Sequence, residues 1–212
     1  MPVLEQNTCL SPEPIISSPC NCNMLQSLNN NPCNYFQSYK YFSHVDLQSV
    51  FSLKDYWMAY GRNILKSYCK NCLNVGIHVR RGDHVSANYL GIPSASYFKN
   101  AMGKFNSFTN VRFYVASDEV EWVKQQGVFQ LDNVKNNVKI INTDRDIDFA
   151  TLVACDHMII SIGTFGWWIA FLGSYSRGGD VIYFEDELVE QEKLGNANRD
   201  DYYPSSWIPL GN

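Results

Sequence analysis

The sequence predicts an α/β fold built on a parallel, doubly wound sheet. From Leu73 onward, short runs rich in β-branched and aromatic residues alternate with segments whose apolar residues recur at helical spacing. The chain has 212 residues, 45% of them hydrophobic and 18% charged, which suffices for one ordinary domain with a full core and a short appendage. No internal repeat is visible in the sequence.

Two segments of different composition precede this alternation. Residues 1–34 are rich in Pro, Ser, Asn and Cys and lack periodicity, which predicts an irregular arm. Residues 35–72 carry many aromatic residues at spacings compatible with helices, and predict a helical lead-in that packs on the main domain. The α/β domain is expected over residues 73–190, followed by a C-terminal tail at 191–212.

Five strands are expected, at residues 75–79, 111–116, 138–141, 157–162 and 181–184. Helices are expected between them, at residues 96–105, 118–126, 148–154 and 165–175. Either Ser94 or Ser96 is expected to cap the first helix, and either Asp146 or Asp148 the third. The second helix starts on acidic residues, as the helix dipole favours.

Charge and hydropathy narrow the class of protein. A formal net charge of −4 argues against a nucleic-acid-binding surface, so any affinity for phosphate must come from a few placed arginines. No apolar run reaches the ~18 residues that span a bilayer, and the first residues lack the blocks of a signal peptide. The sequence as written therefore predicts a soluble chain.

Six of the 7 cysteines precede the predicted sheet and fit disulfides in an oxidising compartment, whereas Cys155 stands alone. The CxxC pair of Cys69 and Cys72 also has the spacing of half a zinc site, with Cys20 and Cys22 as the other half. Because no histidine pair or second CxxC completes that pattern, disulfides or free thiols are favoured over zinc.

The first predicted strand runs directly into charged residues, in the stretch LNVGIHVRRGD. Ligands of open α/β sheets bind outside the carboxyl ends of the strands, where Arg80 and Arg81 would lie. Guanidinium forks pair bidentately with phosphate oxygens, and Asp83 can hold one fork or take a proton. His78 either faces the cleft or is a satisfied core residue. The structural alternatives are a surface ion cluster or an Arg-Gly-Asp adhesion tripeptide.

Three further strand ends open on the same edge. The fourth strand runs into small and hydroxylated residues before an apolar helix, whose backbone N–H groups and dipole would form an anion seat without lysine. The alternative there is a plain tight turn with a Ser or Thr cap. Because this seat would lie opposite two arginines, the two features together predict a pyrophosphate site. The candidate residues at these ends are Ser117, Asp118, Asp148, Phe149, Ser161, Gly163, Thr164 and Phe165.

Other motifs of the sequence bear on this prediction. The sequence contains no Walker motif, no GxGxxG and no HExxH, so ATPase, dinucleotide and zinc-protease sites lack support. Asp144, Asp146 and Asp148 form two overlapping DxD units, a spacing that holds a divalent metal in many sugar transferases, although helix capping explains them as well. His157 begins a strand and is expected to be structural.

The stretch from His78 to Asp83 resembles the HxRRGD motif of the α-1,2-fucosyltransferases, the galactoside 2-L-fucosyltransferase family. The block from Asp148 to Trp168 is similar to the second donor-site block of that family, and residues 35–42 look like the segment that precedes its donor domain. Ser117 and Asp118 fall where the family has a strand-end Ser-Asp.

This resemblance implies a GT-B-type Rossmann-like donor domain, GDP-fucose as donor, a galactose-type acceptor, inversion at the anomeric carbon and no metal. On this reading Arg80 neutralises the β-phosphate of the leaving GDP, and Arg81 either braces the loop or shares the phosphate. Asp83 and His78 orient those groups, and Asp83 is the candidate base.

The other candidate residues would complete the donor site by the same resemblance. Asp118 and Asp148 would accept hydrogen bonds from guanine or ribose, and Ser161, Gly163 and Thr164 would seat the phosphates. The family also implies a Golgi location, a membrane anchor and an N-terminal half with a Gly-Asn motif, neither of which is visible in this sequence. The leading interpretation is an enzyme of the α-1,2-fucosyltransferase type, which transfers L-fucose from GDP-fucose to the 2-hydroxyl of a galactose-type acceptor, in a chain that could lack a complete acceptor domain. The alternatives are a non-catalytic module that binds a GDP-sugar, and a metal-dependent transferase that uses the DxD carboxylates.

Overall fold

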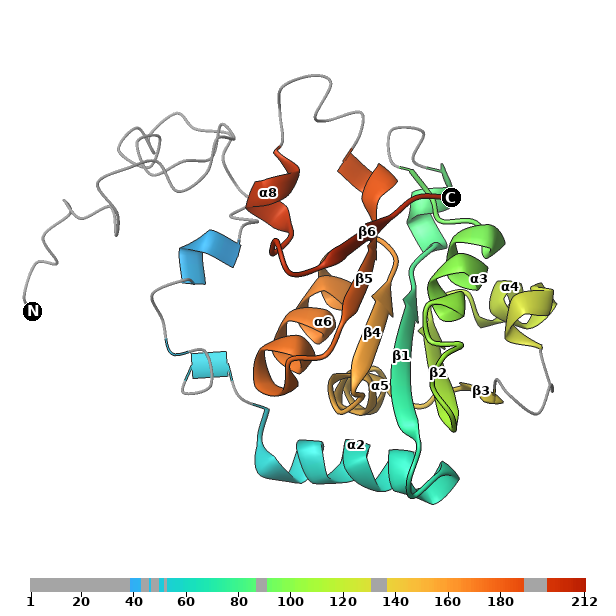
Figure 1. Ribbon diagram of the computed structural model, residues 1–212, viewed down its shortest axis with the longest axis vertical. Helices are drawn as coiled ribbons and strands as arrows, with labels where there is room; N and C mark the ends of the chain where they lie inside the picture. Colours follow the sequence, from blue (N-terminus) through green and yellow to red (C-terminus); the bar gives the residue numbers. More distant parts are fainter. Residues whose placement is uncertain are drawn as a thin grey trace, which may run out of the picture. The chain divides into compact units, whose positions relative to one another are not determined.

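The computed structural model describes residues 39–42, 46, 50–51, 53–86, 91–130, 137–188 and 198–212. In this part of the chain, parallel strands form one sheet in the order β3-β2-β1-β4-β5-β6 (Figure 1). The strands are Leu73–Val79 (β1), Val111–Ser117 (β2), Asn137–Ile140 (β3), His157–Ile160 (β4), Val181–Phe184 (β5) and Ile208–Leu210 (β6). The predicted α/β class with a parallel, doubly wound sheet is confirmed.

Helices connect the strands. The α-helices are Asp55–Tyr68 (α2), Ala95–Gly103 (α3), Val120–Gln125 (α4), Arg145–Val153 (α5), Thr164–Arg177 (α6) and Arg199–Tyr202 (α8). Short 3₁₀ turns lie at Tyr39–Phe42 (η2), Gly82–Ser86 (η3), Gly127–Phe129 (η4) and Glu185–Leu188 (η5). The strand order runs one way from β1 to β3 and the other way from β4 to β6. Right-handed crossovers therefore place α3 and α4 on one face and α5 and α6 on the other.

The start of helix α5 and the C-terminal residues differ from the sequence prediction. Helix α5 begins at Arg145, and Asp144 is its N-cap, because the Asp144 side chain accepts a hydrogen bond from the backbone N–H of Asp146. The prediction that Asp146 or Asp148 caps this helix was wrong, because the cap lies two residues before the first and four before the second. Residues 208–210, predicted to lie in a C-terminal tail, pair with β5 as β6. Three residues that include Pro209 carry too weak a strand pattern to be recognised.

The core packs on both faces of the sheet. On one face, α3 contributes Tyr97 and Phe98, both fully buried, and the Tyr97 hydroxyl donates to the carbonyl of Ile160 at 2.6 Å. On the other, α2 packs against α5 so closely that a Cβ on Gly61 would lie 2.4 Å from the carbonyl oxygen of Ala150. Helix α2, which is part of the predicted helical lead-in, thus packs directly on α5, a helix that covers the sheet.

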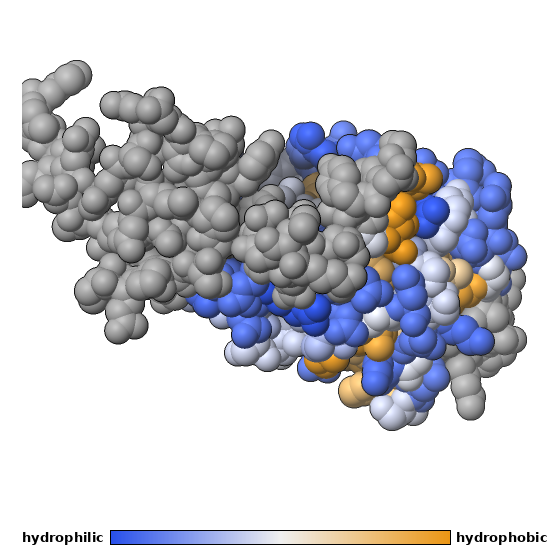
Figure 2. Space-filling model, turned by 90° about the horizontal axis from the view of Figure 1, so that it is seen from above, coloured by the Kyte–Doolittle hydropathy of each residue, from blue (hydrophilic) through white to orange (hydrophobic). Residues whose placement is uncertain are grey.

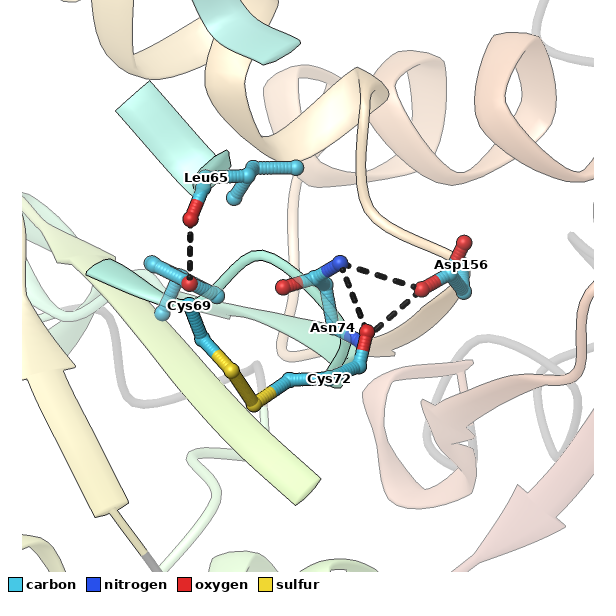
Figure 3. Close-up of a disulfide and its surroundings, with 6 residues drawn as sticks. Leu65, Cys69, Cys72, Asn74 and Asp156 are labelled. Carbon is cyan, nitrogen blue, oxygen red and sulfur yellow. Dashed lines mark hydrogen bonds between the residues drawn. A yellow bond between two sulfur atoms is a disulfide. The ribbon is translucent and has the colours of Figure 1, made fainter. Parts of the chain in front are cut away.

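A disulfide between Cys69 and Cys72 closes the turn from α2 into β1 (Figure 3). Next to it, Asp156 accepts hydrogen bonds from the backbone N–H of Asn74 at 2.8 Å and from its side-chain amide at 3.2 Å. Cys155 is free and buried, and burial raises the pKa of its thiol well above the usual range. The remaining cysteines, for which disulfides were predicted, are Cys9, Cys20, Cys22 and Cys33, and they lie outside the described residues.

The chain divides into two compact units, one of Met1–Asp46 with Leu188–Ser205 and one of Leu47–Glu187 with Ser206–Asn212. Within the first unit, Lys40 pairs with the buried carboxylate of Asp201 at 2.6 Å. The second unit holds the sheet. The domain boundaries predicted at residues 34, 72 and 190 remain a proposal. Among the described residues, no helix has both the length and the apolar character to cross a bilayer.

Candidate functional site

The candidate site lies where strand order reverses, between β1 and β4. These two strands are neighbours, but the chain leaves them toward opposite sides of the sheet, and ligands of such sheets bind at this point. The loops that follow are joined: the backbone N–H of Arg80 donates to the hydroxyl of Ser161 at 2.7 Å. The backbone N–H of Ser161 donates to the carbonyl of His78 at 3.1 Å. The two loops that were predicted to bind an anion therefore contact each other.

The guanidinium of Arg80 is held between two carboxylates. Its Nη1 donates to Asp118 at the end of β2, and its Nη2 donates to Asp83, each at 2.6 Å. The Arg80 side chain remains 35% exposed, so this fixed cation still faces solvent. Two anions thus orient Arg80, which is a pre-positioned cation at the edge of the sheet.

The turn after Arg80 requires glycine. Gly82 has a φ of 25°, and a Cβ there would lie 2.4 Å from Oδ2 of Asp118. The other oxygen of Asp118 accepts the backbone N–H of Arg81 at 3.0 Å. Both oxygens of Asp118 thus hold the Arg80–Arg81 loop, and the predicted contact of Asp118 with guanine or ribose stays a prediction.

Arg81 turns away from Arg80. Its guanidinium carbon lies 4.0 Å from the ring centroid of Trp122 in α4, and its Nη1 donates to the carbonyl of Pro93 at 3.4 Å. Of the two roles left open for Arg81, this geometry favours bracing the loop. Trp122 was not predicted, because no sequence signal marks an aromatic ring that a helix brings under an arginine.

His78 is buried beneath this loop, with 5% of its surface exposed. Its ring lies 5.3 Å from that of Phe165, which lies 5.3 Å from Phe149, so three predicted donor-site residues form one aromatic layer. Among the described residues, Nδ1 of His78 has no hydrogen-bond partner. Burial lowers the pKa of His78 to about 4; Asp118 opposes this shift and Arg80 adds to it. The imidazole is therefore neutral at physiological pH.

This low pKa predicts a pH dependence of stability. Between about pH 6.5 and pH 4 the unfolded histidine binds a proton that the folded one does not, so stability falls as the pH falls through this window. We expect the free energy of unfolding to drop by about 2 kcal/mol from pH 7 to pH 5 through His78. Urea titrations of the wild type and His78→Gln over this pH range measure the effect. Equal pH dependence in the wild type and His78→Gln would refute the assignment.

The second loop ends at the start of α6. Gly163 is the N-cap, with a φ of 88°, and a Cβ there would lie 3.9 Å from Cγ of Arg80. The predicted anion seat thus adjoins the predicted cation. The backbone N–H of Gly163 donates to the carboxylate of Glu187 at 3.0 Å. Glu187 was not predicted, although the acidic run directly after a strand at the same sheet edge was an available signal.

Two residues predicted to lie in the donor site, Ser117 and Asp148, form hydrogen bonds with residues close to them in the sequence. The Ser117 hydroxyl accepts the backbone N–H of Glu119 at 2.9 Å, and Asp148 accepts the hydroxyl of Thr143 at 2.7 Å. Asp148 also lines a pocket of about 480 Å³ whose walls come from α2, α4, β3 and α5, and Arg80 is not part of that wall.

Of the DxD carboxylates, Asp144 caps α5. His157 accepts the backbone N–H of Asp180 at 2.9 Å, in keeping with its expected structural role.

Figure 2 looks down on the molecule from the top of Figure 1, the side at which β1 ends. In this view hydrophilic residues cover most of the described surface, and hydrophobic residues form small patches between them.

Strand order, crossover and switch-point loops together define the Rossmann-like class of α/β domains. The model of glycosyl transferase family 11 matches residues 22–210, and the chain belongs to this family. It is 30% identical over 197 residues to galactoside alpha-(1,2)-fucosyltransferase 1 of Saimiri boliviensis boliviensis, covering 84% of this chain and 50% of the relative. The protein of the same name from Sus scrofa is 31% identical over 169 residues, 72% of this chain and 43% of the relative.

The chain thus spans about half the length of the curated relatives it matches. A crystal structure of POFUT1 in complex with GDP has a similar fold, with a TM-score of 0.50 and 11% identity over 61% of this chain and 46% of that one. The family resemblance stated from the sequence motifs is confirmed.

Proposed function

We propose that this chain forms the GT-B-type donor side of a galactoside α-1,2-fucosyltransferase. It binds GDP-fucose and supports transfer of L-fucose, with inversion and without a metal, to the 2-hydroxyl of a galactose-terminated glycan. Arg80 contacts the β-phosphate, and the backbone N–H groups at the start of α6 seat the diphosphate. The observation that carries the proposal is the position of Arg80, fixed by Asp83 and Asp118 beside Gly163 at the switch point of the sheet.

Chemistry supports this assignment. Departure of GDP places negative charge on the diphosphate, and a cation held in advance by the protein stabilises that charge without reorganising. Arg80 has this arrangement, because two carboxylates orient it before any ligand arrives. His78 lies under the same loop as a neutral group, and no described residue forms a hydrogen bond with its Nδ1. We propose that it orients the loop and the bound phosphate.

The proposal is tested by calorimetry with GDP and by a transfer assay with GDP-fucose and a galactose-terminated disaccharide. We expect GDP to bind and transfer to persist in EDTA. Binding without transfer would favour the non-catalytic module, and loss in EDTA with recovery in Mn²⁺ would favour the DxD carboxylates. A chain that does not bind GDP would overturn the donor-side assignment.

We also propose that the protein acts in the Golgi lumen, as the family resemblance implies. The Cys69–Cys72 disulfide supports this location, because disulfides persist in oxidising compartments and are rare in the cytosol.

A further inference from the structure

Both arginines of the Arg80–Arg81 loop are held by one short stretch of chain, the junction between β2 and α4. Asp118, directly after β2, accepts from the guanidinium of Arg80 at 2.6 Å and from the backbone N–H of Arg81 at 3.0 Å. In the first turn of α4, the ring centroid of Trp122 lies 4.0 Å from the guanidinium carbon of Arg81. The junction thus fixes Arg80 through a carboxylate and Arg81 through an aromatic face.

The two guanidinium groups have different surroundings. Arg80 lies between two carboxylates, whereas the described residues offer Arg81 the Trp122 ring and, at 3.4 Å, the carbonyl of Pro93. A cation–π contact holds a planar guanidinium by its face, so it limits the orientation of the whole group. The Arg81 side chain is therefore held on the α4 side of the loop, while Arg80 is held by carboxylates.

Trp122 can support this loop because it is itself packed on the core. Its ring centroid lies 6.3 Å from that of Phe98 in α3 and 6.4 Å from that of Phe129 in η4, at interplanar angles of 63° and 65°. Both phenylalanines are buried, and edge-to-face pairs of this kind are favourable. The hydrophobic core formed with α3 and η4 therefore extends to the guanidinium of Arg81.

We infer that Trp122 is a positioning residue for the proposed donor site: by holding Arg81 against α4, it keeps the loop in the conformation in which Arg80 meets the phosphate. This inference rests on the proposed function and extends it from Arg80 to the ring that supports its loop. Arg80 and Arg81 are adjacent in the chain, so fixing the Arg81 side chain restricts the backbone that carries Arg80. Accuracy matters here, since a displacement of about 1 Å in an active site can slow a reaction on the order of 10²-fold.

The first test is made without a ligand, by native-state hydrogen exchange. Trp122→Leu removes the aromatic face but keeps an apolar side chain toward α3 and η4. We expect the backbone N–H of Arg81, which donates to Asp118, to exchange about two- to fivefold faster in this variant, the effect of one exposed cation–π contact. Trp122→Phe keeps an aromatic face and should exchange close to the wild-type rate. Equal protection of Arg81 in Trp122→Leu and the wild type overturns the inference, whether or not the protein binds GDP.

The second test measures GDP affinity by calorimetry. Trp122→Leu is expected to weaken GDP binding about two- to fivefold, and Trp122→Phe to restore most of the loss. In an Arg81→Ala background the cation is already absent, so Trp122→Leu should have no further effect. An equal loss in both backgrounds overturns the positioning role, because Trp122 then acts through the fold in general.

Trp57→Leu is the matched control, because Trp57 is a half-buried tryptophan of α2 beside Tyr56, and this variant should bind GDP as the wild type does. If the wild type binds GDP and Trp122→Leu binds it equally well, the positioning role is overturned and the proposed function stands. If the wild type does not bind GDP, the proposed function itself fails, and the exchange rate of Arg81 still decides whether Trp122 holds the loop.

Discussion

Replacing Arg80 by alanine is expected to weaken GDP binding by about 10- to 100-fold and to slow fucosyl transfer on the order of 10²–10³-fold. Two effects act together. The variant loses a cation that can form charge-assisted hydrogen bonds to phosphate, and it leaves Asp83 and Asp118 facing the ligand without their shared partner. Calorimetry with GDP and a transfer assay with GDP-fucose measure both consequences.

Two further variants make this result specific. Arg80→Lys keeps the charge but not the planar fork, so it cannot reproduce both carboxylate contacts and should retain part of the GDP affinity. Arg62→Ala removes an exposed arginine from α2 and should bind GDP as the wild type does. An Arg80→Ala protein that is folded and binds GDP with wild-type affinity would show that the diphosphate site lies elsewhere.

Gly166→Ala is expected to reduce the free energy of unfolding by about 1–3 kcal/mol, because the added methyl group overpacks a closed region. A Cβ at Gly166 would lie 2.4 Å from Nδ1 of His78 and within 3.2 Å of two of its ring carbons. The His78 ring is buried and lies beside the ring of Phe165, so it has little room to move away. Urea unfolding at pH 7 measures the loss.

The source of this strain can be isolated by a double-mutant cycle. If the methyl group clashes with the imidazole, then adding Gly166→Ala to a His78→Ala background should cost much less than adding it to the wild type. Gly103→Ala is the control, because the nearest atom to a Cβ there is 3.8 Å away. Equal costs in the two backgrounds would place the strain somewhere other than the His78 ring.

The sequence pattern was sufficient for the parts of the fold that depend on local order along the chain. β1 to β5 and the helices between them carry β-branched runs or helical spacing that can be read without knowing what they contact. The loops at the ends of β1 and β4 could be predicted to share a site, because parallel strands end at one edge of the sheet. What could not be predicted from the pattern is which strands are neighbours.

The details of the site depend on that neighbourhood. Asp118 was recognised as a strand-end carboxylate, but its ion pair with Arg80 exists only because β2 lies beside β1. Trp122 and Glu187 were missed for the same reason: one lies under Arg81 and the other beside Gly163 through tertiary packing across more than twenty residues of chain. Residue types and strand ends are local information, whereas the partner of a charged side chain is not.

The most direct test is a crystal structure of the protein with GDP bound. The diphosphate is predicted to lie at the end of β1 and β4, within hydrogen-bonding distance of the Arg80 guanidinium and of backbone N–H groups at the start of α6. A diphosphate bound away from Arg80, for example in the pocket between α2, α4, β3 and α5, would contradict the assignment of the switch point as the donor site.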